Sequence, residues 1–248
     1  MIDFLKTIIY VPLYNALALI LNIEWVDAGI ATIILTILVK LLLYPIAKKA
    51  SITQFKMKEK EGELNSIKEK YKDKQEQAVK TMEFYKTNNI NPFSSILTIL
   101  IQIPIIYSLY YIFFKSGLPA VDASLLYSFI KMPTSVSMEF LGFFDVSKKS
   151  IVLAILAAVS SFLQMHFASS AIKNPKDSKL TSAKAPAGKE DFAQMLTKQM
   201  KYTMPIMVFI ISWQISGVVA LYWFVSNLAG IAQDAYIKRN FKKTTPQS

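Results

Sequence analysis

The chain has no cysteine, one histidine and a single arginine among its 248 residues. Without cysteine it cannot form disulfides or thiolate metal sites, and His166 has no second metal ligand nearby in the sequence. Arg239 alone cannot supply the arginine patches that stack on bases, so the net charge of +11 does not indicate specific DNA binding. Nucleophile–base pairs, phosphate loops and metal-ligand clusters are also missing, so we expect neither catalysis nor a cofactor.

Charge of either sign is scarce as well. Only 18% of the residues are charged, against about a quarter in soluble domains, and they lie in blocks between long apolar runs. The apolar runs have about the 20 residues that a helix needs to cross a bilayer, and in lipid the backbone must satisfy its own hydrogen bonds. The sequence therefore predicts an all-α polytopic membrane protein with a five-transmembrane-helix bundle. The predicted spans are 29–47, 92–114, 150–170, 204–220 and 221–237.

The lysines predict how this bundle is oriented. They crowd residues 48–91, residues 171–203 and the tail after Asp234, whereas residues 115–149 hold few. Positively charged loops stay in the cytoplasm, so the N-terminus is expected outside and the C-terminus inside.

Residues 1–27 form a separate N-terminal segment. A polar stripe recurs at helical spacing through Asp3, Thr7, Tyr10 and Tyr14. This stripe favours an amphipathic helix that lies in the membrane interface. A sixth span, or an uncleaved signal over Phe4–Ile23, is the alternative.

Residues 48–91 predict a cytoplasmic helical hairpin, rich in Lys, Glu and Gln, with its turn at Lys72–Lys74. A thin apolar seam runs through it, formed by Ile52, Phe55, Leu64, Ile67, Tyr71, Val79, Met82 and Tyr85. The hairpin is either a solvated spacer or a docking arm for a partner. Residues 171–203 predict a flexible cytoplasmic loop, and residues 241–248 a basic, disordered tail.

Two stretches go beyond generic membrane patterning. In Phe84–Tyr111, Asn91-Pro92 opens a span and Gln102-Ile103-Pro104 lies inside it, while Gly217–Arg239 contains Leu221-Tyr222-Trp223 and Asn227-Leu228. Together with ILTILVKLLLYP in the first span, these motifs resemble the YidC/Oxa/Alb family of membrane protein insertases. The resemblance covers about residues 7–240 and implies the insertase core, residues 28–240, without a large periplasmic domain.

The resemblance implies a mechanism. A hydrophilic groove inside the bundle would open to the cytoplasm and to lipid but be closed on the outer side. A basic residue in the first span would attract a polar or acidic substrate segment, while the substrate's apolar helix leaves along the third and fifth spans. It also implies a bacterial plasma-membrane protein that works as a monomer. Its implied partners are nascent membrane proteins, the ribosome, the Sec translocon, the signal recognition particle receptor and membrane lipids.

Lys40 is the expected basic residue. A charge inside a span costs about 2.5–3.5 kcal/mol or more, and Lys40 lies seven residues from Ala47, about 10 Å along the helix, which is too far for comfortable snorkelling. Thr36 and Thr32 precede it by one and two turns on the same face. The candidate groove residues are Lys40, Thr36, Thr32, Gln102, Gln164, Gln214, Trp223, Tyr222 and Asn227. Interhelical hydrogen bonding for Gln102 and an aromatic belt for Tyr222-Trp223 are the alternative roles.

The chain departs from the family pattern at two positions. The family usually has arginine where Lys40 stands, so the charge is kept but the bidentate fork is lost. The fourth span lacks a proline before Ser216-Gly217, which leaves the expected kink to these two residues. A transporter that uses Lys40 as its coupling group is the competing hypothesis, but no internal repeat supports it. A passive assembly scaffold is a third, and it is compatible with insertion.

Overall fold

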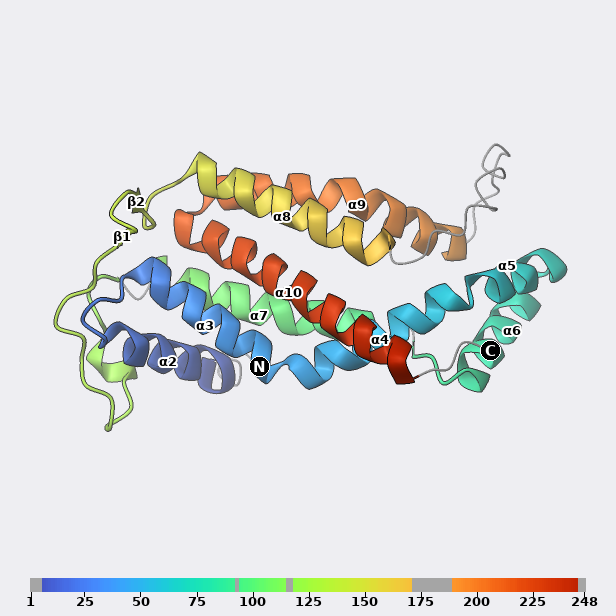
Figure 1. The fold of residues 1–248 in the computed structure, drawn as a ribbon, viewed down its shortest axis with the longest axis horizontal. Coiled ribbons are helices and arrows are strands. Elements are labelled where there is room, and N and C mark those ends of the chain that lie inside the picture. The colour runs from blue at the N-terminus through green and yellow to red at the C-terminus, as the bar shows by residue number, and fades with distance from the viewer. Residues whose placement is uncertain (1–5, 92–93, 115–117, 171–188, 245–248) are drawn as a thin grey trace.

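The computed structural model describes residues 6–91, 94–114, 118–170 and 189–244, and these are mostly α-helical (Figure 1). Their α-helices are α2 (Val11–Leu21), α3 (Ala28–Leu42), α4 (Tyr44–Glu59), α5 (Glu61–Lys70), α6 (Lys74–Thr87), α7 (Ser94–Phe114), α8 (Ile151–Ser170), α9 (Lys189–Gln214) and α10 (Gly217–Thr244). Shorter elements are η1 (Lys6–Tyr10), η2 (Ala123–Leu125) and the antiparallel pair β1 (Glu139–Phe140) and β2 (Phe144–Asp145). The predicted all-α class is confirmed for these residues. Parts of the predicted N-terminal segment, second span, 171–203 loop and C-terminal tail lie outside them, as does Pro92.

Helix α10 lies in the middle of the bundle (Figure 1). It contacts α3, α4, α7, α8 and α9, so most of the other helices pack on it. Helices α8 and α9 run side by side on one flank, and α2 packs along α3 on the other. One apolar core joins these layers through buried side chains such as Leu35, Ile112, Ala157 and Val218.

The first predicted span, 29–47, is not one straight helix. Helix α3 ends at Leu42, α4 begins at Tyr44, and the two are bent by 65°. Pro45 lies in the first turn of α4, where its missing N–H costs little, but its ring does not allow α3 to continue through it. This bent pair passes as a membrane span by length and composition, whereas no single helix in the described residues is long and apolar enough to do so.

The predicted boundary between the fourth and fifth spans, at residues 220 and 221, is wrong. Helix α9 ends at Gln214 and α10 begins at Gly217. Ser216-Gly217 therefore separates two helices instead of bending one. The predicted loop is wrong at its end as well, because residues 189–203 form the first part of α9.

The start of α10 is fixed by hydrogen bonds to a distant part of the chain. The N–H groups of Gly217 and Val218 donate to the carbonyls of Lys148 (2.8 Å) and Val146 (2.9 Å). A Cβ at position 217 would lie 3.1 Å from the Val146 Cα, so only glycine allows this approach without a shift. These contacts explain why the helix begins at Gly217, four residues before the predicted boundary.

The N-terminal helical segment turns two members of its predicted polar stripe, Tyr10 and Tyr14, inward, whereas Thr7 is exposed. Tyr10 and Tyr14 are buried (6% and 2% exposed), whereas Ile8 and Leu19 are more than half exposed (54% and 57%). The two tyrosines thus face the protein core, and the reasoning that led from this stripe to an interfacial helix is wrong for them. Asp3 lies outside the described residues. The position of α2 relative to a lipid surface stays a prediction.

Residues 118–149 form a closing segment that folds over one end of the bundle, at the left of Figure 1. Asn15 of α2, which is 1% exposed, ties this segment down with both atoms of its amide. Its Nδ2 donates to the Leu125 carbonyl (2.8 Å), and its Oδ1 accepts from the Tyr127 N–H (2.7 Å). A buried amide satisfied on both sides fixes the segment's register on α2.

The β1–β2 turn fits against the start of α3. The ring of Phe140, 8% exposed, lies so close to Gly29 that a Cβ there would be 2.3 Å from it. Asp27 caps α3 by accepting from the Ile30 N–H (2.8 Å), and the Ala28 N–H donates to the Ser137 carbonyl (2.8 Å). The closing segment is therefore anchored at the N-termini of both α3 and α10.

Helices α5 and α6 project as a pair from the opposite end (Figure 1). Their small core is Leu64, Phe84 and Ile90, with Met57, Ile67 and Tyr85 packed against it. Asp73 caps α6 by accepting from the N–H groups of Gln75 (3.0 Å) and Glu76 (2.9 Å). Val79 and Met82, predicted in the seam, are exposed instead, because Phe84 defines a different inner face of α6.

We expect Phe140→Ala to lower the free energy of unfolding by about 3 kcal/mol, since it empties the contact with Gly29 in a buried site. The measurement is thermal unfolding in detergent, followed by tryptophan fluorescence. Phe143→Ala is the matched control, because Phe143 lies in the same turn but is 86% exposed. Equal losses for the two variants would show that the turn does not close the bundle.

Candidate functional site

Polar side chains are buried among the apolar core of the bundle, and large apolar side chains are exposed on its outside. Buried polar side chains are Asn15, Thr32, Thr36, Ser108, Ser160, Ser161, Ser212, Ser216, Ser226 and Asn227. Exposed large apolar side chains include Ile37, Leu38, Leu100, Ile103, Ile151, Val152, Ile155, Leu156, Val159, Leu163, Ile206 and Ile210. Water-soluble proteins seldom expose so many large apolar side chains, and such exposure marks a lipid or protein contact.

Lys40 lies on the last turn of α3, just before the bend, and is half-buried. No carboxylate of the described residues lies within 4 Å of its amine. Its backbone carbonyl accepts a hydrogen bond of 2.9 Å from Nε2 of Gln233 on α10. The position of Lys40 in the bundle is thus fixed by α10, while its charge is unpaired at ion-pair distance.

The two threonines before Lys40 are fully buried and already hydrogen-bonded. Thr32 Oγ1 donates to the Ala28 carbonyl (2.7 Å), and Thr36 Oγ1 donates to the Thr32 carbonyl (2.6 Å). Each bond stays within α3, so the hydroxyls keep acceptor capacity but their protons are used. They form one polar stripe with Lys40 on the inner side of α3.

Gln102 and Tyr222 meet between α7 and α10. The Gln102 amide donates to the Tyr222 hydroxyl, and Tyr222 is 2% exposed. This contact fits the interhelical role for Gln102, and it places Tyr222 inside the protein and not at its surface. Trp223, the next residue, is half-buried and packs on the main core.

Asn227 and Gln164 both lie between α8 and α10. Asn227 Nδ2 donates to Ser160 Oγ (3.0 Å) and to the Ala157 carbonyl (3.4 Å). Gln164 fits over Gly230, where a Cβ would be 2.3 Å from its Nε2. The absence of a side chain at Gly230 therefore makes room for the Gln164 amide inside the bundle.

Gln214 is not brought to this site. It is exposed at the last residue of α9, near the closing segment, whereas Lys40 lies toward the opposite end of α3. The other predicted site residues lie along the inner sides of α3, α7, α8 and α10.

Sequence reasoning missed three residues at the Lys40 end. Gln233 holds the Lys40 carbonyl, and Asp234 Oδ1 accepts a hydrogen bond of 2.5 Å from Ser51 Oγ on α4. The sequence does single out Asp234, because it is the first charged residue after the longest uncharged run near the C-terminus. Its contact with a serine 183 residues away could not be deduced from helical periodicity.

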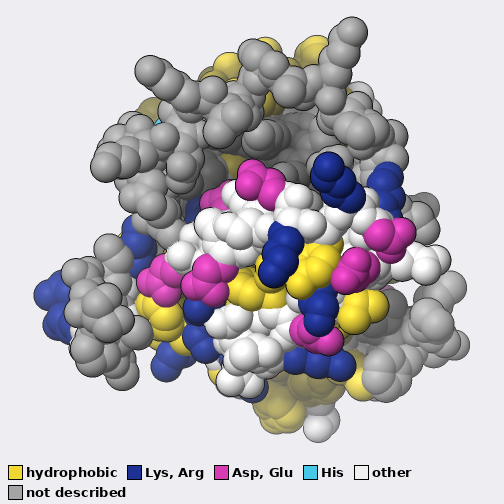
Figure 2. Space-filling model, turned by 90° about the vertical axis from the view of Figure 1, so that its right-hand side faces the viewer, with side chains coloured by type: hydrophobic (Ala, Val, Ile, Leu, Met, Phe, Trp, Pro, Cys, Tyr) yellow, Lys and Arg dark blue, Asp and Glu magenta, His cyan; other side chains and the backbone are white. Residues whose placement is uncertain are grey.

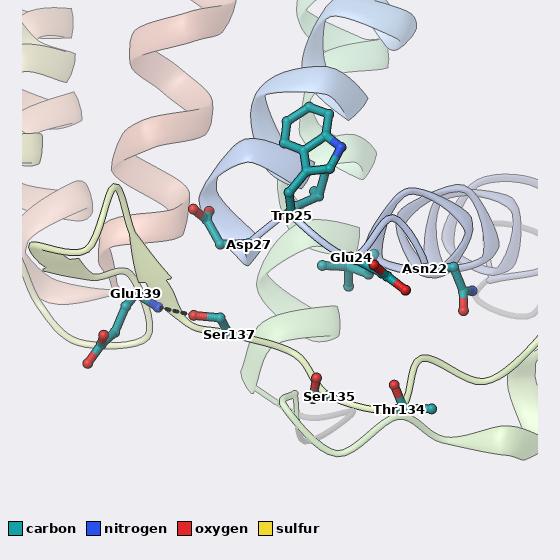
Figure 3. A pocket seen from close by; sticks show the side chains of 10 residues that line it. Asn22, Glu24, Trp25, Asp27, Thr134, Ser135, Ser137 and Glu139 are labelled. Carbon is teal, nitrogen blue, oxygen red and sulfur yellow. Dashed lines mark hydrogen bonds between the residues drawn. The ribbon is translucent and has the colours of Figure 1, made fainter.

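A separate cavity of about 360 Å³ opens beside the closing segment (Figure 3). Glu24, Trp25 and Asp27 line it from the connection between α2 and α3, and Ser137 and Glu139 line it from the other side. It lies at the far end of α3 from Lys40 and is not part of the polar interior. No cluster of side chains in the described residues is suited to hold a metal ion.

The projecting helices present charges of both signs. Figure 2 views this end and shows lysines interspersed with carboxylates around small apolar areas. Ion pairs join Lys60 to Glu63 (3.0 Å) and Lys80 to Glu83 (2.9 Å). Nearer the bundle, partial burial lowers the pKa of Lys58, with Glu61 acting in the opposite direction. Such a mixed surface suits water or a charged partner better than the apolar interior of a bilayer.

A helical bundle with an apolar exterior and buried polar groups defines the class of α-helical membrane proteins. Comparison with known proteins assigns the family within that class. The model of the family described as 60Kd inner membrane protein matches residues 20–244, and the chain belongs to this family.

Proteins named membrane protein insertase YidC are among the relatives. The one from Fusobacterium nucleatum is 33% identical, over 93% of this chain and 97% of its own length. The one from Clostridium perfringens is 32% identical, over 88% of this chain and 82% of its own length. A third, from Wolinella succinogenes, is 28% identical over 92% of this chain, which spans 38% of that longer relative.

We expect Gly230→Ala to destabilise the bundle by about 1 kcal/mol, because the new methyl group displaces the Gln164 amide. The second substitution Gln164→Ala should restore most of the loss. Thermal unfolding of the single and double variants in detergent measures both effects. Gly62→Ala is the control, since nothing lies within 4 Å of its added methyl group. A loss at Gly230 that Gln164→Ala does not relieve would contradict the described packing.

Proposed function

We propose that this protein inserts nascent membrane proteins into the lipid bilayer. The observation that carries the proposal is the line of polar side chains inside an apolar bundle, ending at the unpaired charge of Lys40. The relatives named as insertases support the same function. Hydrogen bonds between helices account for several of these groups, but no carboxylate of the described residues lies within 4 Å of the Lys40 amine, and an unpaired charge inside a span is costly.

The inner sides of α3, α7, α8 and α10 act as a hydrophilic groove that opens to the cytoplasm and to lipid. Lys40, Thr36, Thr32, Gln102, Gln164, Tyr222, Trp223 and Asn227 contribute to it. The closing segment argues for a groove with one closed end, since Phe140 and Val146 are buried where it meets α3 and α10. A polar substrate segment can thus be received without a continuous pore.

Lys40 attracts the acidic or polar segment of a substrate to this groove. The attraction is significant because the charge is half-buried, where water screens it less than at the surface. The substrate's apolar helix then moves into lipid along α8 and α10. The exposed side of α8 offers it an apolar surface at Ile155, Val159 and Phe162.

No nucleotide is needed for this transfer. Moving an apolar helix from water into the bilayer is itself favourable, and the membrane potential acts on charges that cross. The protein resides in the bacterial inner membrane with its N-terminus outside, and it places α5, α6 and the basic C-terminus in the cytoplasm. There the ribosome, the Sec translocon and the signal recognition particle receptor are its proposed partners. It works as a monomer.

Reconstitution tests the function. Proteoliposomes that contain only this protein should insert a single-span substrate with an acidic translocated tail, scored by protection of the tail from added protease. Protein-free liposomes and liposomes with heat-inactivated protein are the controls. Passage of ions or solutes without insertion would favour the competing transporter hypothesis and overturn the proposal.

In the same assay, we expect Lys40→Arg to retain activity because it keeps the positive charge. Lys40→Glu should lower insertion of acidic-tailed substrates about tenfold or more, since attraction becomes repulsion inside a poorly screened site. Lys48→Glu makes the same charge change at an exposed position of α4 and should have little effect. Insertion by the Lys40→Glu variant at the wild-type level would show that groove polarity, and not charge, receives the substrate.

A further inference from the structure

Asp234 is an acidic residue at the place where the proposed groove attracts acidic segments. It lies on α10 directly after Gln233, whose amide is 2.9 Å from the Lys40 carbonyl. It is partly buried, and Ser51 of α4, the helix that follows the bend after Lys40, donates a hydrogen bond to it.

The carboxylate is held in place. Ser51 of α4 donates a 2.5 Å hydrogen bond to its Oδ1, and Gln233 fixes the neighbouring turn of α10 on the end of α3. Two adjacent residues of α10, Gln233 and Asp234, are therefore hydrogen-bonded to α3 and α4, the helices on the two sides of the 65° bend. Asp234 therefore lies beside the residue of α10 that is bonded to Lys40, and its carboxylate is not within 4 Å of the Lys40 amine.

A fixed negative charge beside a half-buried lysine lowers the positive potential that a substrate meets. If the site served only to attract acidic segments as strongly as possible, a neutral residue would serve better at position 234. A moderated charge has an advantage, since a segment bound too tightly would not leave the groove. We propose that Asp234 is a built-in counter-charge to Lys40, which sets how strongly the groove discriminates substrates by the charge of their translocated segments. This inference rests on the proposed insertase function.

The alternative is that Asp234 only ties α4 to α10. Two substitutions separate these roles. Asp234→Asn removes the charge but keeps an oxygen that can accept from Ser51. Ser51→Ala removes the hydrogen bond but keeps the charge.

The experiment uses proteoliposomes of the full chain and substrates that differ only in having no, one or two acidic residues in the translocated tail. With Asp234→Asn, insertion of the acidic substrates should rise by about two- to fivefold relative to wild type, the range expected for interactions between partly exposed charges. Insertion of the neutral substrate should not change. The gain should disappear in a Lys40→Gln background, because no amine is then left for Asp234 to oppose. Ser51→Ala should change the dependence on substrate charge much less, because the Gln233 contact still keeps Asp234 on the turn of α10 beside Lys40.

Asp234→Asn with wild-type dependence on substrate charge overturns the inference, and so does a Ser51→Ala variant that reproduces the Asp234→Asn effect. Either result is compatible with the proposed insertase function, because the wild-type protein still inserts the neutral substrate. Failure of wild type to insert any substrate overturns the function instead.

A second readout does not need insertion. The melting temperatures of wild type, Lys40→Gln, Asp234→Asn and the double variant in detergent form a thermodynamic cycle. Coupling between the two substitutions supports the counter-charge, and additive shifts overturn it.

Discussion

Hydrogen bonds from helix α10 hold the bundle together. Gln233 binds the end of α3, Asp234 binds α4 through Ser51, Tyr222 binds α7 through Gln102, and Asn227 binds α8 through Ser160. In an apolar environment such bonds replace the hydrophobic driving force that packs soluble helices, each contributing about 0.6 kcal/mol on average. Pro45 makes the break between α3 and α4, α10 binds the helices on both sides of it, and the start of α10 receives the closing segment.

The same bonds explain why polar groups are buried inside an otherwise apolar core. Each side chain that joins α10 to a neighbour also leaves polar atoms inside the bundle, and the close approach at Gly230 brings the Gln164 amide in as well. Phe140 closes one end of this interior at Gly29, whereas Lys40 brings a charge toward the other. A polar interior with one closed end and one charged end is suited to receive a polar segment temporarily, and this is the physical basis of the proposed insertion.

The sequence predicted the helices well where apolar length decides them, as for residues 150–170, which the structure shows as α8. It failed where a tertiary contact decides. The start of α10 depends on the carbonyls of Val146 and Lys148, which no helical period reveals, and the break at Leu43 depends on a proline read as part of a span. The polar stripe predicts that Tyr10 and Tyr14 face water, but their rings pack inward. Periodicity identifies a face of a helix but not the direction in which that face points.

Family motifs identified Tyr222, Asn227 and Gln102, but the isolated residues Ser51 and Asp234 belong to no motif.

Photocrosslinking along a stalled substrate tests the central claim most directly. A photoreactive amino acid replaces, one at a time, Thr36, Gln102 and Trp223 on the inner side and Gln214 at the exposed end of α9, and a ribosome-bound nascent chain with one acidic translocated segment is supplied. The account predicts crosslinks from the three inner positions to the acidic segment and none from Gln214. Crosslinks from Gln214 alone, or equal yields from all four positions, would contradict a substrate groove in the polar interior.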